Sequence, residues 1–481
     1  MEAQAFEYYL RDATRRGEPL EGGFDGAAGG APCGDLVRVS LALAEGVVGR
    51  VSWAAEGCAS ARAAAAAVAE LAVGEPVLDC ARIGPDDIAA ELGGIGAQGR
   101  HAVELAADAL HRALAGAAGA AGRLATPPPG ERILVALSGG VDSAVAALLE
   151  RERGAEVVTV TLKLWSDERT DAERSCCSPR AVLGARALAG QLGVAHFTLD
   201  LEQTFRERVV GAFVGGYRAG QTPNPCVICN GDLRIDAMID LADRLGCAAL
   251  ATGHYARIAD DGEGPLLTTA ADPAKDQSYM LSGLRPASLA RLRFPLAELT
   301  KPEVRELASA AGLPVASKAE SQDLCFLAGE GKRSFLERQG GLGDLPGAIV
   351  GSGGDELGRH GGYHRFTVGQ RRGLGIGSHD PLYVLAIDAA SNTVVVGDRE
   401  ELQTRRVRVR DATLHRAGGR VDRVRLRYHA RPLACSIGPV GAGEHDELEL
   451  ALAEPAEGVA PGQTACLMSG DAVVGRATIA A

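Results

Sequence analysis

The chain has 481 residues, of which 46% are hydrophobic and 23% charged, and its formal net charge is −12. This length suggests about three domains, and the composition excludes a fibrous or wholly disordered protein. We expect no membrane span, because no apolar run approaches about 18 residues, and no secretory signal. The eleven cysteines are unevenly spaced, which indicates a cytoplasmic protein with catalytic or metal-binding thiols rather than a disulfide framework.

The charge is distributed unevenly along the chain. Residues 1–125 hold 10 basic and 17 acidic side chains, whereas residues 405–431 hold ten Arg against only Asp411 and Asp422. Such a local positive excess is a candidate surface for a polyanion. A solvated sheet face is the alternative interpretation.

The N-terminal module is predicted to span residues 1–123, with an Ala-rich helix at 63–69. Ala-Gly-rich sequence at 115–122 then leads into three consecutive prolines at 127–129. Prolines cannot continue a helix, so we expect residues 124–130 to form a stiff, polyproline-type linker.

Strands and helices are predicted to alternate over residues 131–335. The expected strands are 133–137, 157–164, 196–201 and 248–252. The expected helices are 142–153, 179–192, 205–217, 233–245 and 301–311, the last of them capped by Thr300. This order is typical of an α/β domain with a parallel, Rossmann-like sheet.

Glycine is dense after residue 340, and the helical periodicity ends there. Residues 405–410 and 423–428 alternate with a period of two, as half-exposed antiparallel strands do. We therefore predict a small central β domain at 336–402 and a C-terminal β-barrel at 403–481.

A glycine pair joins the first predicted strand of the α/β domain to its helix. In Ser138-Gly139-Gly140-Val141-Asp142-Ser143, backbone N–H groups can approach a phosphate at the positive end of the helix dipole. The lysine of a Walker loop is absent, and the spacing is not that of a dinucleotide fold. The pattern resembles the loop of the pyrophosphate-loop ATPases, which split ATP between the α and β phosphates. A plain strand-to-helix turn is the alternative.

Three cysteines lie in motifs. Cys226 and Cys229 follow Thr222-Pro223-Asn224-Pro225, just before a predicted helix whose N-terminus lowers the pKa of nearby thiols. Cys325 lies in Ser321-Gln322-Asp323-Leu324-Cys325-Phe326. By contrast, three cysteines without motifs are expected to be inert: Cys247, Cys435 and Cys466.

These motifs, in this order, resemble those of the bacterial tRNA-specific 2-thiouridylases. The likeness covers about residues 130–481 and includes A-T-G-H-Y-A-R at 251–257, K-D-Q-S-Y at 275–279, and further motifs at 362–373, 427–428 and 461–463. It implies that ATP, with Mg²⁺, adenylates the carbon-2 oxygen of the wobble uridine of tRNA, and that a persulfide supplies sulfur. The rival functions are a small-molecule ATP pyrophosphatase of the synthetase type and an iron–sulfur scaffold with a regulatory ATPase.

The resemblance also implies residue roles. Cys229 is the implied nucleophile and Cys325 the persulfide carrier, and the two can form a disulfide when sulfur is released. The implied ATP contacts are Leu137, Ser138, Gly139, Gly140, Val141, Asp142, Ser143, Ala144, Leu162 and Gly253. The target base is assigned to Asn224, Pro225 and Cys226, and other tRNA contacts to His254, Lys275, Asp276, Gln277, Arg427, Tyr428 and Gln463. The implied partners are tRNA and a sulfur donor, either a cysteine desulfurase or a sulfur-relay protein.

One position departs from that family, in which many members have Asp where this chain has Cys226. Cys226, Cys229 and Cys325 together match the number of ligands that a four-iron four-sulfur cluster with one open iron requires. Three interpretations stay open: an iron–sulfur cluster, a persulfide relay without a cluster, and zinc. Cys176-Cys177 is a candidate accessory for redox or sulfur handling, with an inert pair as the alternative.

The N-terminal module resembles the NifU/IscU-type scaffolds of iron–sulfur assembly over about residues 4–118. Cys33, Asp35, Cys58 and His101 match the ligand set of that family, but Ala102 stands where its last cysteine belongs. The remaining set can bind zinc or hold a labile cluster, and a degenerate domain kept for docking is the alternative. The favoured function is wobble-uridine 2-thiolation, with a fused domain that supplies iron–sulfur or sulfur.

Overall fold

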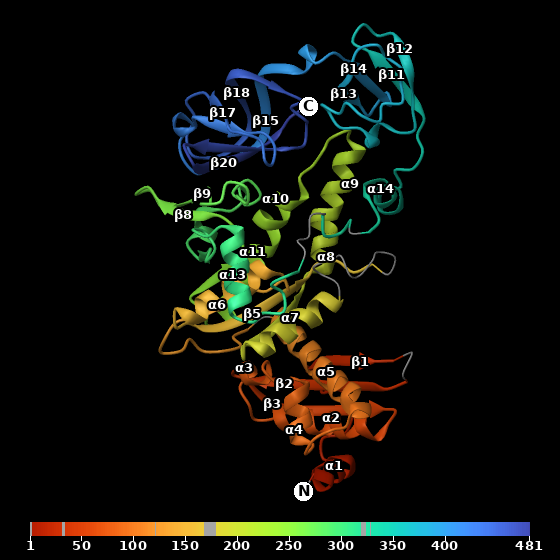
Figure 1. The fold of residues 1–481 in the computed structure, drawn as a ribbon, viewed down its shortest axis with the longest axis vertical. Coiled ribbons are helices and arrows are strands. Elements are labelled where there is room, and N and C mark those ends of the chain that lie inside the picture. The colour runs from red at the N-terminus through yellow and green to blue at the C-terminus, as the bar shows by residue number, and fades with distance from the viewer. Residues whose placement is uncertain (1, 31–33, 121, 168–178, 319–323, 328) are drawn as a thin grey trace.

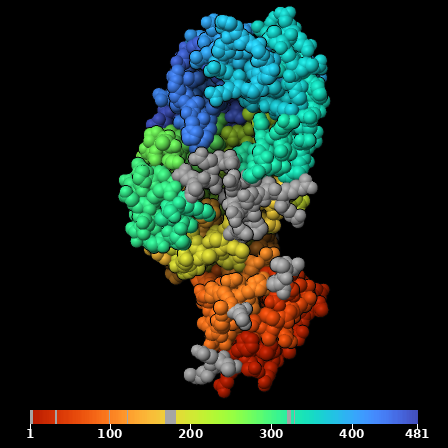
Figure 2. All heavy atoms as spheres, turned by 45° about the vertical axis from the view of Figure 1, so that its right-hand side comes forward, coloured from red at the N-terminus to blue at the C-terminus, as the bar shows by residue number. Residues whose placement is uncertain are grey.

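The computed structural model describes residues 2–30, 34–120, 122–167, 179–318, 324–327 and 329–481. The molecule is elongated, with the N-terminal domain at one end, the α/β domain in the middle and two β domains at the other end (Figure 1). Figure 2 shows the same order from another side. No helix in the described part of the chain is long and apolar enough to cross a membrane.

The N-terminal domain packs helices against a three-stranded antiparallel sheet. β1 (Phe24–Gly29), β2 (Leu36–Ala44) and β3 (Val47–Glu56) pair in that order, and α2 (Ala59–Ala72) and α5 (Arg100–Gly119) pack on them. The buried face of α2 is almost entirely alanine, which lets this helix pack closely. The smaller elements are α1 (Glu2–Arg11), α3 (Val77–Cys80), α4 (Pro85–Glu91) and η1 (Ala97–Gly99).

The α/β domain contains a five-stranded sheet in the order β10-β7-β4-β5-β6, and each neighbouring pair is parallel. The predicted parallel, Rossmann-like sheet is therefore confirmed. The sequence did not reveal β10, because two residues carry no readable periodicity. The strands are β4 (Arg132–Ala136), β5 (Glu156–Lys163), β6 (Ala195–Asp200), β7 (Ala249–Thr252) and β10 (Leu292–Arg293). The flanking helices are α6 (Val141–Glu152), α7 (Pro179–Gln191), α11 (Ile235–Arg244), α12 (Pro286–Leu289) and α13 (Lys301–Ala310).

Two helical segments on the barrel side of this domain begin earlier than predicted. The first runs from α8 (Glu202–Phe205) through a π-helical turn, Arg206–Val210, into α9 (Gly211–Arg218). The second runs from α10 (Pro225–Cys229) through another π-helical turn, Asn230–Arg234, into α11. Such π turns are frequent at functional sites.

The start of α10 corrects the prediction that Cys226 and Cys229 precede a helix, because both lie within it. The side chain of Asn224 accepts a hydrogen bond from the Val227 N–H, and Pro225 occupies the first helical position. This combination is a strong helix start, since proline has no N–H to lose there.

The two β domains complete the chain. The central domain is a four-stranded sheet in the order β12-β11-β14-β13, reached through α14 (Lys332–Gly340). The predicted C-terminal barrel is confirmed: six strands in the order β15-β18-β17-β16-β19-β20 close on themselves through a β15–β20 pairing. A hairpin of the α/β domain, β8 (Arg257–Asp260) and β9 (Pro265–Thr268), extends the barrel sheet from β20. The remaining strands are β11 (Gly347–Gly351), β12 (Glu356–His360), β13 (Tyr383–Asp388), β14 (Thr393–Gly397), β15 (Gln403–Leu414), β16 (Arg423–Arg425), β17 (Leu433–Ser436), β18 (Gly443–Glu457), β19 (Thr464–Ser469) and β20 (Ala472–Ile479).

The N-terminal domain is docked on the α/β domain rather than merely tethered to it. α5 packs along β6, the edge strand of the parallel sheet, and the backbone N–H of His196 donates to the Ala81 carbonyl at 3.1 Å. The Arg186 side chain donates to Asp108 at 2.7 Å across the same joint. The joint therefore covers a strand edge that would otherwise be exposed.

The start of the predicted stiff linker is also held in place by contacts with the α/β domain. The Arg244 carbonyl accepts hydrogen bonds from the N–H groups of Leu124 and Ala125, and the Arg244 side chain donates to the Ala118 and Ala120 carbonyls. The Ala-Gly-rich sequence before it is helical as far as Gly119, because its alanines pack into the domain core.

Candidate active site

The phosphate loop lies at the carboxyl end of β4, at the N-terminus of α6. Gly139 has a φ of +69°, which favours glycine, and Gly140 is the N-cap of α6. The Ser143 hydroxyl donates to the Gly140 carbonyl at 3.0 Å and accepts from the Ser138 N–H at 3.1 Å. This closed turn fixes a helix N-terminus at the sheet edge, which is a ready anion site.

Gly253 follows β7 and lies directly against this loop. A β-carbon at Gly253 would lie 2.7 Å from both the carbonyl carbon of Asp142 and the nitrogen of Ser143. Leu162 is the last residue but one of the neighbouring strand β5. The residues implied for ATP therefore share the carboxyl edge of the sheet, where ligands bind in open α/β folds.

Two lysines that the sequence analysis missed also reach the loop. Lys301 donates to both carboxylate oxygens of Asp142, at 2.7 and 2.8 Å, and the Tyr255 hydroxyl donates to the same carboxylate at 2.8 Å. Lys318 donates to the Gly139 carbonyl at 2.8 Å. Both lysines lie more than 150 residues after the loop, so no local pattern could have assigned them to it.

Cys229 and Cys325 belong to one apolar cluster. Cys229 is 7% exposed, and the half-buried Cys325 packs against the same group of residues. Phe326, the neighbour of Cys325, lies 5.1 to 6.4 Å, between ring centroids, from four other aromatic rings: Trp165, Phe205, Phe213 and Phe335. The aromatic contacts of Phe326 thus hold Cys325 at the cluster that contains Cys229.

The cysteines without motifs behave as predicted. Burial raises the pKa of Cys247, Cys435 and Cys466 to about 12 in each case. A thiol with such a pKa carries almost no thiolate near neutral pH and is a poor nucleophile.

The metal interpretation of the three motif cysteines finds no support in the geometry. Cys226, Cys229 and Cys325 are all described, and within the described residues no three His, Cys, Asp or Glu side chains are grouped so as to hold a metal ion. In this conformation the three cysteines therefore do not form a ligand set by themselves. Cys176 and Cys177 lie outside the described residues.

Aromatic residues of the α/β domain and the barrel surround the start of α10. Burial raises the pKa of Tyr428, and the charge of Asp276 raises it further. The ring of Tyr428 lies 6.0 Å, between centroids, from that of Tyr279, which is fully buried and hydrogen-bonds with Asn224. Tyr279 thus links Tyr428 of the barrel to Asn224, one of the residues implied for the target base.

A buried ion pair joins two of the motifs implied for tRNA. Arg425 donates to Asp276 at 2.7 Å, and the two side chains are 12% and 6% exposed. Asp276 also accepts from the Ser278 hydroxyl at 2.8 Å, so its carboxylate is engaged by the protein itself. The pair holds Lys275, which is half-buried, in the same region as the exposed Arg427.

Gln463 and His254 contact the segments on either side of α10. Gln463 donates to the Thr222 carbonyl at 2.6 Å. His254 accepts from Arg234 at 2.6 Å and lies 2.8 Å from the Thr252 hydroxyl. Burial, followed by the charge of Arg234, lowers the pKa of His254 to about 3, so this imidazole is neutral at physiological pH.

The arginines of residues 405–431 are largely compensated. Seven of them form ion pairs with carboxylates: Arg406, Arg410, Arg416, Arg420, Arg423, Arg425 and Arg431. Arg427 instead donates to the carbonyls of Glu457 and Gly458. A guanidinium bonded to carbonyls keeps its net charge for a phosphate. The positive excess in the sequence thus overstates the cationic surface.

The candidate metal site of the N-terminal domain is partly described, since Cys33 lies outside the described residues. The Cys58 N–H donates to Asp35 at 2.7 Å, and the Cys58 thiol donates to the other carboxylate oxygen at 3.2 Å. Gly57 permits this contact, because a β-carbon there would lie 2.0 Å from an Asp35 oxygen. His101 is exposed in the first turn of α5, and Ala102 is buried.

Models of known families match successive parts of the chain. They are described as a NifU-like N terminal domain (11–119), a tRNA methyl transferase HUP domain (131–329), a tRNA methyl transferase PRC-barrel domain (333–398) and an aminomethyltransferase beta-barrel domain (400–479). Together with the cysteine site, this architecture defines a tRNA sulfurtransferase with a HUP-type ATP-binding domain, fused to a NifU-like domain.

Curated relatives narrow the assignment. A bifunctional protein NifU/MnmA of Rubrobacter xylanophilus is 46% identical over 95% of this chain and 93% of its own length. The tRNA-specific 2-thiouridylases MnmA of Acidithiobacillus ferrooxidans and Chloroflexus aggregans are 42% and 43% identical, each over 72% of this chain and 97% and 98% of their own lengths. The chain belongs to the NifU/MnmA family of tRNA-specific 2-thiouridylases.

Proposed function

We propose that this chain catalyses ATP-dependent 2-thiolation of the wobble uridine of tRNA, in the cytoplasm. One observation carries the proposal: motifs from the α/β domain and the barrel converge on the start of α10. The Arg425–Asp276 ion pair joins the barrel to the α/β domain. The hydrogen bond from Gln463 to Thr222 joins the barrel to the residues just before α10. An unpaired base of a tRNA loop suits such a site, because a stacked base cannot be reached.

The first step activates the base. ATP places its phosphates at residues 138–143, beside Lys318 and the Lys301–Asp142 ion pair. Mg²⁺ bound chiefly through phosphate oxygens and water would neutralise charge that develops there. The carbon-2 oxygen of the uridine attacks the α phosphorus, and pyrophosphate leaves. The carbon-2 oxygen, which is a poor leaving group by itself, can then depart as part of AMP.

The second step transfers sulfur from a persulfide on Cys325, loaded by a cysteine desulfurase or a sulfur-relay protein. The Cys229 thiolate attacks the Sγ atom of Cys325, forms a disulfide with it and expels the outer sulfur as hydrosulfide. Hydrosulfide adds to carbon 2 of the base, AMP departs and 2-thiouridine remains. A thiol reductant then returns the disulfide to two thiols. The apolar cluster around Cys229 limits competing hydrolysis of the adenylate.

For the N-terminal domain we infer a transient hold on zinc or an iron–sulfur cluster at Cys33, Asp35, Cys58 and His101. Asp35 and Cys58 lie in contact at an exposed position, and Cys33, another member of the set, lies outside the described residues. The missing ligand at Ala102 favours release over storage, because a metal with fewer ligands is held less tightly.

The test is an anaerobic assay with tRNA, ATP and a soluble persulfide donor, in which 2-thiouridine, AMP and protein-bound iron are measured together. The proposal expects equal amounts of 2-thiouridine and AMP from iron-free protein, and the same from a Cys226→Asp variant. No 2-thiouridine under these conditions would contradict the proposed function. Thiolation that requires iron, and that is lost with iron in Cys226→Asp, would replace the persulfide relay by the cluster.

A further inference from the structure

A cavity of about 550 Å³ lies between α9, α10 and the barrel, on the far side of α10 from the catalytic cysteines. In a helix, Val227 and Ile228 lie about half a turn from Cys226 and Cys229. Val227, Ile228 and Asn224 line the cavity, and the two cysteines do not. The two cysteines therefore do not line the cavity, although Ile228 borders both the cavity and the cluster that contains Cys229.

The cavity has two contrasting walls. Three small residues of α9 and its C-cap residue leave a flat apolar shelf: Ala212, Gly215, Gly216 and Ala219. The barrel side is polar and carries Arg410, Thr464, Arg476 and Thr478. A flat apolar wall opposite hydrogen-bonding groups suits a nucleobase, and the volume falls in the range of small-ligand sites.

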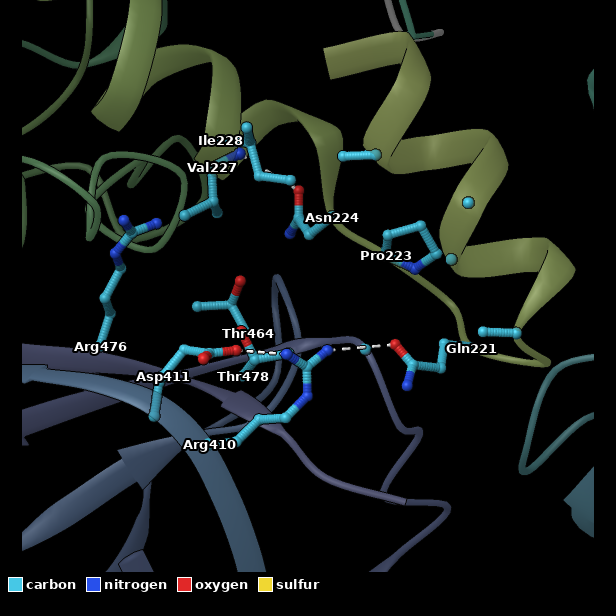
Figure 3. Close-up of a pocket in the computed structure, with 16 residues that line it drawn as sticks. Gln221, Pro223, Asn224, Val227, Ile228, Arg410, Asp411, Thr464, Arg476 and Thr478 are labelled. Carbon is cyan, nitrogen blue, oxygen red and sulfur yellow. Dashed lines mark hydrogen bonds and ion pairs between the residues drawn. The ribbon is translucent and has the colours of Figure 1, made fainter. Parts of the chain in front are cut away.

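Arg410 is held at the floor of the cavity by contacts at both ends of its guanidinium. It donates to Gln221 at 3.3 Å and forms an ion pair with Asp411 (Figure 3). Asp411 has a φ of +50°, where the β15–β20 register shifts between Arg410 and Thr413. Bulges of this kind re-aim side chains next to functional sites. Unpaired bases stack on fixed guanidinium planes of this kind.

The walls are fixed to each other around the target-base segment. Arg476 donates to both carboxylate oxygens of Asp232, at 3.0 and 3.1 Å, and thereby ties β20 to the helix that carries the cysteines. The Thr222 N–H donates to the Pro461 carbonyl at 2.8 Å. The cavity is thus formed before any ligand arrives, and it shares Asn224 with the segment implied for the target base.

We propose that this cavity binds the base of an unpaired nucleotide next to the target uridine, in the same tRNA loop. The inference rests on the proposed function, because it needs tRNA at the start of α10. Placing a neighbouring base on the opposite face of α10 would pull the loop open and turn the target base toward Cys229. The cavity then selects tRNA by shape and stacking, as is common for single-stranded RNA.

Gly215 offers a direct test, because it lines the cavity and a β-carbon there would meet nothing within 4 Å. We expect Gly215→Leu to weaken binding of an anticodon stem–loop by roughly tenfold or more, as the loss of one stacked base does. Gly190→Leu is the matched control: this exposed helical glycine of α7 also has nothing within 4 Å of its β-carbon and lies far from the cavity. It should bind and thiolate as the unchanged protein does.

A second arm identifies the occupant. Stem–loops that lack the base on the 5′ or the 3′ side of the target uridine are titrated against both forms of the protein. One of these deletions should weaken binding to the unchanged protein by a similar factor and have no further effect on Gly215→Leu. Independent, additive losses would overturn the inference, as would full binding by Gly215→Leu. Thiolation by the unchanged protein in the same assay separates this failure from a failure of the proposed function.

Discussion

The chain contains two sites with candidate sulfur or metal chemistry, and the protein surrounds them in opposite ways. In the N-terminal domain, Cys58 is exposed at a helix start and is bonded to Asp35. In the α/β domain, Cys229 is buried in an apolar cluster against which Cys325 packs. An exposed thiol beside a carboxylate can exchange its ligand with solvent or a partner, whereas a closed apolar site protects a reactive intermediate from water.

The two sites also lie on opposite sides of the parallel sheet. α10 lies between this sheet and the barrel, whereas α2 and α5 lie beyond the other edge of the domain (Figure 1). The Arg244 contacts hold the start of the linker against the α/β domain, and the two sites lie apart in this conformation. In this conformation the N-terminal domain therefore cannot hand sulfur or a cluster directly to Cys325. A sulfur donor would have to approach Cys325 from outside the molecule.

The largest effect is expected at the buried site. Cys229→Ser and Cys325→Ser should each reduce 2-thiouridine formation by roughly 10³-fold or more, because a hydroxyl cannot take either role and the two cysteines act as one unit. ATP binding, measured by equilibrium dialysis, should stay unchanged, since neither residue touches the phosphate loop. Cys435→Ser, at a half-buried cysteine of the barrel, is the control. Substantial thiolation by either variant would remove the chemical contrast between the two sites.

The next effect tests the ATP edge of the same site. Gly253→Ala places a methyl group where the Asp142–Ser143 backbone lies only 2.7 Å away. Displacing the loop by about 1 Å should lower kcat/KM for ATP roughly 100-fold. Gly184→Ala in α7, where the β-carbon meets nothing within 4 Å, should have no effect. Normal ATP kinetics in Gly253→Ala would show that the loop can move away at little cost.

The loop and the cysteines were predictable from sequence, and their surroundings were not. A strand, a glycine pair and a helix form a local pattern, so the place of residues 138–143 followed from neighbouring residues alone. Lys301, Lys318 and the Arg425–Asp276 pair depend on contacts across more than 140 residues. The helix start at Pro225 was missed because the helix was predicted to begin only at residue 233, although Asn224 and Pro225 carry a cap and a first-turn signal.

The same distinction explains the basic segment and the linker. Counting arginines over residues 405–431 cannot reveal that Asp261 pairs with Arg416 and Arg420 from another domain. Proline content predicted a stiff linker, but only the fold shows that Arg244 holds it. The composition of a segment predicts its charge and its stiffness. Which residue each charged or polar group contacts depends on the tertiary structure.

The joint between the two regions should respond to acid. It buries His111 of α5, 3.0 Å from the Ile83 carbonyl, and His196 of β6, 2.9 Å from the Thr159 hydroxyl, beside the Arg186–Asp108 pair. Burial, followed by the charge of Arg186, lowers the pKa of His111 to about 3, and burial also lowers the pKa of His196. Below about pH 6.5 the unfolded chain binds protons that the folded joint does not, so stability falls as pH falls.

For each of the two histidines, the free energy of unfolding should fall by about 1.4 kcal/mol per pH unit below about pH 6.5. Urea unfolding between pH 5 and 8 measures the slope, and Trp53 reports on the N-terminal domain by fluorescence. His111→Gln keeps a donor for the Ile83 carbonyl and should remove one histidine's share of the slope. His379→Gln, at a fully exposed histidine, should leave it unchanged. An unaltered slope in His111→Gln would mean that the joint does not depend on this neutral imidazole.

A smaller effect is expected on the tRNA surface. Arg427→Ala should weaken tRNA binding several-fold and reduce the slope of log affinity against log salt by about 0.7 to 0.9, the contribution of one phosphate contact. Arg406→Ala is the matched control, because this exposed arginine of the same segment is paired with Glu449. Equal slopes for both variants would assign residues 405–431 to a solvated sheet face.

The smallest effect is expected at the exposed site of the N-terminal domain. Cys58→Ser removes the thiol that contacts Asp35 but keeps a side chain that can cap α2 in the same way. When a soluble persulfide donor loads Cys325, thiolation should stay within about twofold of the unchanged protein. The reason is that the 2-thiouridylase of Acidithiobacillus ferrooxidans matches 72% of this chain with 97% of its own length, which leaves little of it to match the N-terminal domain. Zinc or iron bound to the N-terminal domain, measured on the same samples, should fall. A large loss of thiolation with intact folding would show that sulfur passes through Cys58, and that the two sites form one relay despite the sheet between them.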